Sequence, residues 1–525
     1  MRRFMGAVAA MAAAAVWSVA IPASAETVLK VSLHSDLKIV DPIWTTALIS
    51  THYGNMVYDT LFAVDANLKP QPQMVDKWDV SPDKLTWTFT LRDGLEWHDG
   101  KPVTGEDCVA SIKRWAAKDS MGQKLMSEVS ELSAPDAKTI KMVLKEPYGL
   151  VLDSLAKPSA NMAFMMPKRV AETPPDQQIT DYTGSGPFIF KKDEWKPGEK
   201  AVFVKNTKYK PRNEPPSGLA GGKVVKVDRV EWIAIPDQQT QVNALLNGEI
   251  DMVEMVPPDL LPLLQQDKNI KIMVVNAAGR QYEMRFNELT KPFDNPKIRE
   301  AALYALDQKP FLEANVGNPE YYKLCKSVFP CGSPLETTKG WDDKLQGNVA
   351  KAKELLKEAG YDGTPIVMLH QTDIAGHNQL ATVAKPQLEA AGFKVDLQAM
   401  DWQTLVSRRA KKDPADKGGW SAFFTSWGSP DVMNPVSAAF INASCDKAAF
   451  GWPCDAEIEK LRDAYSKETD PAKQKAIAEQ VSLRLSSGYP TFAPLGQFTA
   501  PTAFRSNISG ILPVPELALW NVEKK

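Results

Sequence analysis

Two tryptophans and one acid in the second half of the chain could together hold a small solute. Trp427 and Asp431 lie within the segment 426–431, and Trp402 precedes them. A tryptophan face offers a large, rigid surface for stacking or for cation–π contact. A carboxylate beside it can pair with an ammonium group where water is excluded. Such side chains have the chemistry to hold a solute that carries an amine, although Trp402 also suits a hydrophobic core.

Catalytic patterns are the main competing chemistry. Thr183 stands where the serine-hydrolase turn G-x-S-x-G needs its first glycine, so segment 183–187 does not match that motif. The sequence contains no H-E-x-x-H, phosphate loop or dinucleotide-binding glycine pattern. Adjacent acids such as Asp342 and Asp343 suit a solvated surface, and His98 suits a structural role in a turn. No catalytic residue is therefore predicted, although a triad scattered along the chain stays open.

The five cysteines suit an oxidising compartment. Cys325 and Cys331 bracket one short loop, Cys445 and Cys454 bracket another, and Cys108 is left as a buried odd thiol. Two local disulfides are the simplest pairing, but spacing alone does not prove connectivity. None of the five histidines falls beside the cysteines at metal-ligand spacing, so no metal site is predicted.

The N-terminus predicts export. Arg2 and Arg3 precede an alanine-rich apolar run, and the segment 23–25 reads Ala-Ser-Ala, a typical cleavage site. The run is too short for a comfortable membrane span. We therefore expect a signal peptide over residues 1–25 and a soluble periplasmic protein after cleavage.

The charge balance argues against polyanionic partners. The chain has 62 basic and 64 acidic residues, and segment 1–25 carries two arginines and no acid, which leaves 60 against 64, a balance of −4. No block of like charge occurs, so we expect no nucleic-acid partner. About 500 mature residues correspond to roughly three domains.

The segment from Trp78 to Arg114 has a clear local pattern. Apolar residues alternate over 85–91 as in a half-buried strand, and 95–98 alternates again after a turn. Thr104 and Asp107 have the spacing of a capping box at a helix start. The pattern predicts a hairpin followed by a capped helix, with a buried stripe of Cys108, Val109, Ile112, Trp115 and Ala116.

This segment closely resembles the signature of the family 5 extracellular solute-binding proteins, the receptors for peptides, nickel complexes and related solutes. Further family-like segments run through nearly the whole mature chain: Asp41-Pro42, 57–62, 184–188, 245–251, 286–299 and 426–431. The resemblance implies an α/β, two-lobed periplasmic-binding-protein fold with an extra subdomain inserted in the first lobe. Lobe one would span 26–279 and 493–525, lobe two 280–492, and the insertion 66–185.

The resemblance also implies where the solute binds. Segment 426–431 lines the cleft in relatives, which makes Trp427 and Asp431 candidates for ligand contact. Backbone N–H groups of a glycine turn could also approach a ligand closely. His34 follows the first strand, where relatives place a ligand-contacting loop, but it also suits the surface. The ligand-binding candidates are Trp427, Asp431, Trp402, Gly184, Ser185, Gly186 and His34.

The function implied is a receptor that traps a peptide or a small amine-containing solute and delivers it to an inner-membrane ABC permease. We expect a monomer that uses no cofactor. Dipeptide-binding relatives carry an arginine for the peptide carboxylate in a loop that here reads 369–377 without one. His370 and His377 in this loop leave a metal chelate open. A receptor for an opine or oligosaccharide, a secreted hydrolase, and a periplasmic chaperone or sensory adaptor also stay open.

Overall fold

A computed structural model describes residues 26–256, 258–374, 376–468 and 470–525. The predicted signal peptide, 1–25, lies outside the described residues. In the described part of the chain, no helix is both long enough and apolar enough to cross a membrane.

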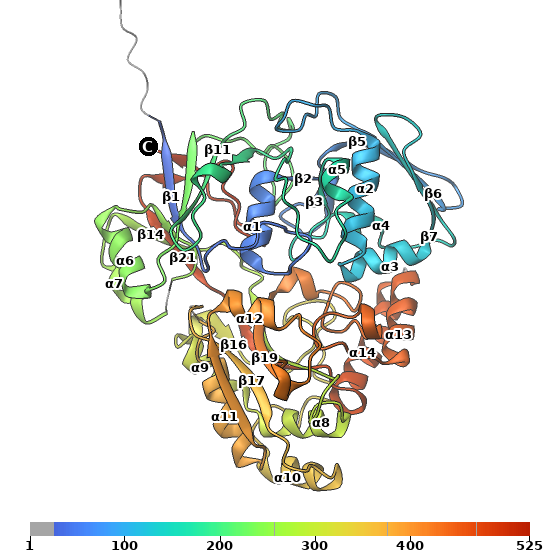
Figure 1. Cartoon of the computed structure of the whole chain (residues 1–525), viewed down its shortest axis with the longest axis vertical. Helices are drawn as coiled ribbons and strands as arrows, with labels where there is room; N and C mark the ends of the chain where they lie inside the picture. The colour runs from blue at the N-terminus through green and yellow to red at the C-terminus, as the bar shows by residue number, and fades with distance from the viewer. Residues whose placement is uncertain (1–25, 257, 375, 469) are drawn as a thin grey trace, which may run out of the picture.

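The upper body in Figure 1 is built on a seven-stranded sheet. β1 lies at its centre and pairs in parallel with β12 and β13. Helix α1 (Leu48–Val57) contacts β10 of this sheet, and α6 (Gln238–Asn247) and α7 (Leu261–Gln265) contact β13 and β14. The strand order is β10 (Phe188–Phe190), β11 (Lys200–Lys205), β12 (Arg229–Ile233), β1 (Val28–Ser32), β13 (Met252–Val253), β21 (Pro501–Arg505) and β14 (Ile270–Val274).

The lower body is built on a six-stranded sheet with its own core. Its strand order is β16 (Tyr322–Lys323), β20 (Phe492–Phe498), β15 (Arg280–Phe286), β19 (Ala422–Gly428), β17 (Ile366–Gln371) and β18 (Val395–Met400). Its helices are α8 (Pro296–Ala305), α9 (Gln308–Asn315), α10 (Val349–Glu358), α11 (Leu380–Ala390), α12 (Trp402–Arg408), α13 (Ala456–Lys467) and α14 (Pro471–Leu483). Asn295 caps α8, and Pro296 stands in its first turn.

A four-stranded antiparallel sheet, with strand order β5-β6-β8-β7, lies at the right of the upper body in Figure 1 and falls within the proposed insertion. The predicted hairpin is wrong: β6 pairs with β5 and β8, and segment 95–98 makes only an isolated bridge from Glu96 to Pro102. β6 therefore pairs with the longer strands β5 and β8 and not with the short segment 95–98 that follows it. The strands are β5 (Val75–Val80), β6 (Thr86–Leu91), β7 (Val129–Ser133) and β8 (Thr139–Leu144).

The predicted capped helix is confirmed as α2 (Gly105–Ala116). Thr104 and Asp107 form the reciprocal capping box, and Cys108, Ile112 and Trp115 are fully buried behind it. The smaller elements of the upper body are α3 (Ser120–Glu128), α4 (Val151–Leu155), α5 (Lys168–Ala171), β2 (Asp59–Thr60), β3 (Phe62–Val64), β4 (Pro70–Pro72), β9 (Phe164–Met165), β22 (Ile508–Ser509) and β23 (Glu523–Lys524).

Two chain crossings join the bodies. The first runs from Val274 at the end of β14 to Arg280 at the start of β15, and the second from Phe498 in β20 to Pro501 in β21. The proposed lobe boundary at 492/493 falls at the start of β20. Arg280 at the start of β15 pairs with Phe498 at the end of β20, so both crossings leave the lower sheet side by side. The two bodies are therefore the lobes of an α/β, two-lobed periplasmic-binding-protein fold.

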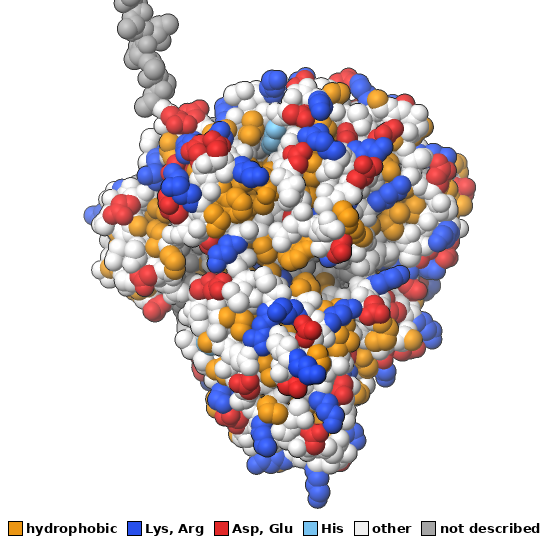
Figure 2. All heavy atoms as spheres, viewed as in Figure 1, with side chains coloured by type: hydrophobic (Ala, Val, Ile, Leu, Met, Phe, Trp, Pro, Cys, Tyr) orange, Lys and Arg blue, Asp and Glu red, His pale blue; other side chains and the backbone are white. Residues whose placement is uncertain are grey.

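The predicted disulfides Cys325–Cys331 and Cys445–Cys454 are both present, and Cys108 is a buried free thiol. Both bridges lie in the lower body. Charged side chains of both signs are interspersed over the face of the molecule in Figure 2.

Candidate ligand-binding site

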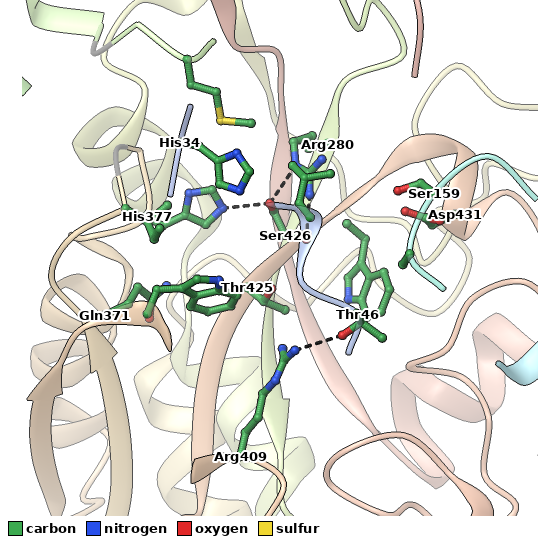
Figure 3. Close-up of a pocket in the computed structure, with 16 residues that line it drawn as sticks. His34, Thr46, Ser159, Arg280, Gln371, His377, Arg409, Thr425, Ser426 and Asp431 are labelled. Carbon is green, nitrogen blue, oxygen red and sulfur yellow. Dashed lines mark hydrogen bonds between the residues drawn. The ribbon is translucent and has the colours of Figure 1, made fainter. Parts of the chain in front are cut away.

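A pocket lies where the two lobes meet, and four of the seven candidate residues line it: His34, Trp402, Trp427 and Asp431. The upper lobe contributes His34, Thr46, Leu48, Ser159, Ala160 and Met255, and the lower lobe contributes Arg280, Gln371, Ile374, His377, Trp402, Arg409, Thr425, Ser426, Trp427 and Asp431. Figure 3 shows residues from both lobes pointing into it.

The pocket adjoins a much larger hollow. The inner pocket encloses about 50 Å³, whereas the hollow measures about 1160 Å³. Both are lined by Thr46, Arg409, Thr425 and Trp427. Since about 10–15 Å³ of such space holds one water molecule, the inner pocket has room for only a few waters, and a larger solute extends into the hollow or parts the lobes.

The glycine turn lies elsewhere. Gly184, Ser185 and Gly186 do not line this pocket; they pack against the end of α1, where a Cβ added at Gly184 would stand 1.9 Å from the Val57 carbonyl oxygen. His98 accepts from the Gly184 N–H and contacts the Gly186 carbonyl oxygen at 3.1 Å. Burial lowers the pKa of His98 to about 4, so this imidazole is neutral at pH 7 and holds the turn in place.

Asp431 is a buried acid with spare hydrogen-bonding capacity. It lies in the short turn Ser429–Val432 that follows β19, is 2% exposed, and its Oδ1 has no hydrogen-bond partner among the described residues. Burial raises the pKa of Asp431 to about 7; Lys157 opposes this and the nearby Glu516 adds to it. The cost of burying such a group falls when a cation approaches it.

Glu516, which the sequence prediction missed, forms a second acid beside Asp431. It is 3% exposed, accepts a hydrogen bond from Ser159, and lies 3.8 Å from Arg280 and 3.4 Å from His52. It belongs to the C-terminal segment that returns to the upper lobe. Only that return in three dimensions brings residue 516 to residue 431, so no local sequence signal could have found it.

His34 belongs to an ion-paired network at the wall of the pocket. Its backbone N–H and its Nδ1 both contact Glu254 Oε2, at 3.0 and 2.7 Å, and His52 Nδ1 lies 3.5 Å from Glu254 Oε1. Burial raises the pKa of Glu254, but the two histidines outweigh it and hold that pKa at about 2. Burial lowers the pKa of His52, but Glu254 and Glu516 outweigh it and raise that pKa overall.

His34, His52 and Glu254 each place one possible metal-ligand atom within 4.8 Å of the others. The hydrogen bond and the two close carboxylates account for this cluster as an ion-paired network.

The lower lobe supplies two arginines that sequence reasoning also missed. Arg280 donates to Ser426 Oγ and to the Ser426 carbonyl oxygen, and His377 Nε2 lies 2.8 Å from the same hydroxyl (Figure 3). Arg409 donates from Nη2 to Thr46 Oγ1 at 2.9 Å, which links the two lobes (Figure 3). Arg280 opens the strand after the first crossing, a position that a predicted lobe boundary could have flagged; nothing local distinguishes Arg409 from Arg408.

Trp427 and Glu283 form a coupled pair at the boundary between pocket and hollow. The Trp427 Nε1–H donates to Glu283 Oε1 at 2.8 Å, and Glu283 Oε2 has no hydrogen-bond partner among the described residues. Burial raises the pKa of Glu283 to about 7 against the attraction of Arg285 and Arg409 and the Trp427 hydrogen bond. Trp427 therefore lines the site, and its hydrogen bond to Glu283 fixes the orientation of its ring.

Comparison with known proteins agrees with this architecture. The family model of the bacterial extracellular solute-binding proteins, family 5, matches residues 69–449. A Sinorhizobium fredii protein named "Probable peptide ABC transporter periplasmic-binding protein" is 42% identical over 507 residues, covering 95% of this chain and 94% of that protein. The glutathione-binding protein GsiB of Escherichia coli is 27% identical over 421 residues, covering 78% and 77%.

Solved structures share the fold. The periplasmic binding protein AgaA of A. tumefaciens R10, in complex with agropinic acid, aligns with a TM-score of 0.79 at 21% identity and covers 95% of this chain and 99% of that one. The binding protein DppA of Helicobacter pylori, in complex with a peptide, gives 0.78 at 21% identity, covering 95% and 98%. The relatives are named as binding proteins, which confirms the prediction of a receptor and not an enzyme. The chain belongs to the bacterial extracellular solute-binding proteins of family 5.

Proposed function

We propose that this chain is the periplasmic receptor of an ABC importer for a solute that carries a free amine, with short peptides as the leading class. The observation that carries the proposal is Asp431 Oδ1, a buried carboxylate oxygen without a partner among the described residues, with Glu516 beside it. An ammonium group bound there would donate a hydrogen bond to the free Asp431 oxygen.

The names of relatives support a peptide-like ligand. They include a peptide-transporter binding protein, a glutathione-binding protein and a DppA structure in complex with a peptide. In our proposal the two lobes close on the solute as a monomer, and the closed form is recognised by an inner-membrane permease. We place lobe one at 26–279 with 493–525 and lobe two at 280–492, except that β20 (Phe492–Phe498) belongs to the lower sheet. The subdomain 66–185 is inserted in the first lobe, and residues 1–25 are removed on export.

The contact with the ligand amine is tested with a peptide that the protein retains from a mixture. Ligand-stripped protein is incubated with casein hydrolysate, retained peptides are identified by mass spectrometry, and the main one is synthesised with a free and with an acetylated N-terminus. Calorimetry should show that acetylation weakens binding to wild type by about 10- to 100-fold, the value of a hydrogen bond to a charged group.

The variant Asp431→Asn should bind both peptides with the same reduced affinity. The matched control Asp396→Asn alters an exposed acid of β18 and should behave as wild type. Equal binding of the two peptides by wild type would overturn the amine contact. If no peptide is retained, peptides are not the ligand class.

A further inference from the structure

The two lobes also meet at the end of the cleft opposite the two chain crossings. Helix α3 of the proposed insertion lies against α13 of the lower lobe, at the right in Figure 1. The strands β14 and β21, which adjoin the crossings, lie at the left. We call this contact the clasp; it joins α3 and Glu146 of the upper lobe to α13 and segment 436–447 of the lower lobe. A rotation of the lobes about the crossings therefore separates the two sides of the clasp.

Met121 is the apolar centre of the clasp. It lies on α3 of the upper lobe, is 2% exposed, and packs into the hydrophobic core cluster of the lower lobe. Leu125 lies one turn further along α3, is fully buried, and belongs to the core cluster of the upper lobe. Consecutive turns of one helix are therefore buried in different lobes. The unbranched methionine side chain adapts to an irregular surface, which suits a contact that is made and broken.

Polar contacts surround Met121. Ser120 Oγ donates to the Val436 carbonyl oxygen at 3.0 Å, and Lys467 Nζ lies 2.5 Å from Glu146 Oε1. Further contacts of the clasp join Gln123 to Asn442 and Lys447, and Lys124 to Asp463. Among the residues that the structure describes, no strand pairing links the two lobes here, so the clasp can open without unfolding either lobe.

The clasp forms part of the wall of the large hollow. Gln123 lines the hollow from the upper lobe, and Asn442 lines it from the lower lobe. Met121, Glu146 and Lys467 line neither the hollow nor the inner pocket. An effect of these three residues on solute binding must therefore act through the position of the lobes and not through contact with the solute.

We propose that the clasp forms when the lobes close and breaks when they part, so that it sets how long the solute stays bound. Met121 is then a positioning residue that acts on the solute without touching it. A contact that exists only in the closed form adds its free energy to that of solute binding. Its loss speeds dissociation and leaves association nearly unchanged. The inference rests on the lobe closure of the proposed function, and it is independent of the amine contact at Asp431.

Met121→Ala and Leu125→Ala form a matched pair of variants on the same helix. Surface plasmon resonance with the peptide retained from casein hydrolysate measures the rates of association and dissociation. Met121→Ala should release the peptide about 10- to 100-fold faster than wild type, the value of burying one such side chain. Leu125→Ala, which alters only the core of the upper lobe, should release it at the wild-type rate.

Thermal denaturation of ligand-free protein should give the opposite order. In the open form the Met121 side chain is already exposed to water, so Met121→Ala should melt at the wild-type temperature. Leu125→Ala leaves a cavity in the core of the upper lobe and should melt at a lower temperature. Either a lowered melting temperature of the ligand-free Met121→Ala protein or peptide release at the wild-type rate would overturn the proposal.

Small-angle X-ray scattering separates failure of the clasp from failure of the proposed function. Wild type should become more compact when it is loaded with the peptide. An unchanged scattering curve would mean that the lobes do not close, which overturns both the clasp and the closing receptor. Compaction of wild type, together with release by Met121→Ala at the wild-type rate, overturns the clasp alone. If no peptide is retained, the same comparisons use the solute that co-purifies with wild type, and mass spectrometry follows its loss during dialysis.

Discussion

Two regions of this protein each bury an arginine and an aspartate, but they differ in how completely these charged groups are hydrogen-bonded. In the upper lobe, Arg114 donates from Nη1 and Nη2 to the two oxygens of Asp41 at 3.1 and 2.7 Å. Asp41 also accepts from the backbone N–H groups of Ile43, Trp44 and Ile179. In the cleft, Asp431 Oδ1 and Arg409 Nε have no such partners among the described residues.

The difference separates structural from binding chemistry. A buried charge is tolerated when its hydrogen bonds are complete, and it costs free energy when they are not. Arg114 is the last residue of the segment that resembles the family signature, and its partner Asp41 belongs to the Asp41-Pro42 motif. These two family-like segments are therefore joined within the upper lobe by a structural ion pair. The residues that we expect to select the solute are the incompletely bonded ones.

The largest effect is expected from Arg114→Met. It leaves the Asp41 carboxylate buried without its cation, which should lower the free energy of unfolding by about 3–5 kcal/mol. Urea denaturation of ligand-free protein measures this change. Ligand affinity at temperatures where the variant is folded should match wild type; a selective loss of affinity would show that this pair belongs to the binding site.

The next effect concerns Gly184, which the sequence nominated for ligand contact. Gly184→Ala places a methyl group against the Val57 carbonyl oxygen, and such overpacking should cost about 1–3 kcal/mol of stability. Thermal denaturation measures the loss, and calorimetry on the folded protein should give an unchanged Kd. Loss of affinity without loss of stability would restore the glycine turn as a ligand contact.

The sequence predicted features that depend on neighbouring residues. The capping box at Thr104 and both disulfides involve groups close in the chain. The hairpin at 85–98 was wrong because β6 finds β5 and β8 instead. Strand pairing is decided across the fold, and alternation alone does not choose the partner.

The candidate site was predictable only in part, for the same physical reason. The sequence pointed to Trp427 and Asp431 because segment 426–431 resembles the corresponding segment of the family. Glu516, Arg280 and Arg409 come from three distant segments that meet only in the folded protein. Their role depends on burial and on missing hydrogen-bond partners, neither of which a single sequence displays.

The third prediction concerns how the charge of Asp431 changes stability with pH. The pKa of Asp431 is about 7, above the usual carboxyl value of about 3.9. Between these values the folded protein holds a proton that the unfolded chain has released, so Asp431 lowers stability as pH rises, by at most about 1.4 kcal/mol per unit.

Asp431→Asn should therefore gain stability over wild type as pH rises from 5 to 8, measured by urea denaturation at each pH. Glu283 and Glu288 also have pKa values of about 7, but they are present in both proteins and cancel in the difference. A constant difference across this range would mean that Asp431 is already ionised in the folded protein.

The smallest effect is expected from Trp427→Phe, which keeps an aromatic wall but removes the N–H that donates to Glu283. That donor stabilises the ionised carboxylate, so its loss should raise the pKa of Glu283 above its present value of about 7. Stability should fall by about 1 kcal/mol at pH 8 and by less at pH 5, where Glu283 is protonated in both proteins. Urea denaturation at the two pH values measures the difference. An equal loss of stability at both pH values would assign the effect to lost ring packing and not to the lost hydrogen bond with Glu283.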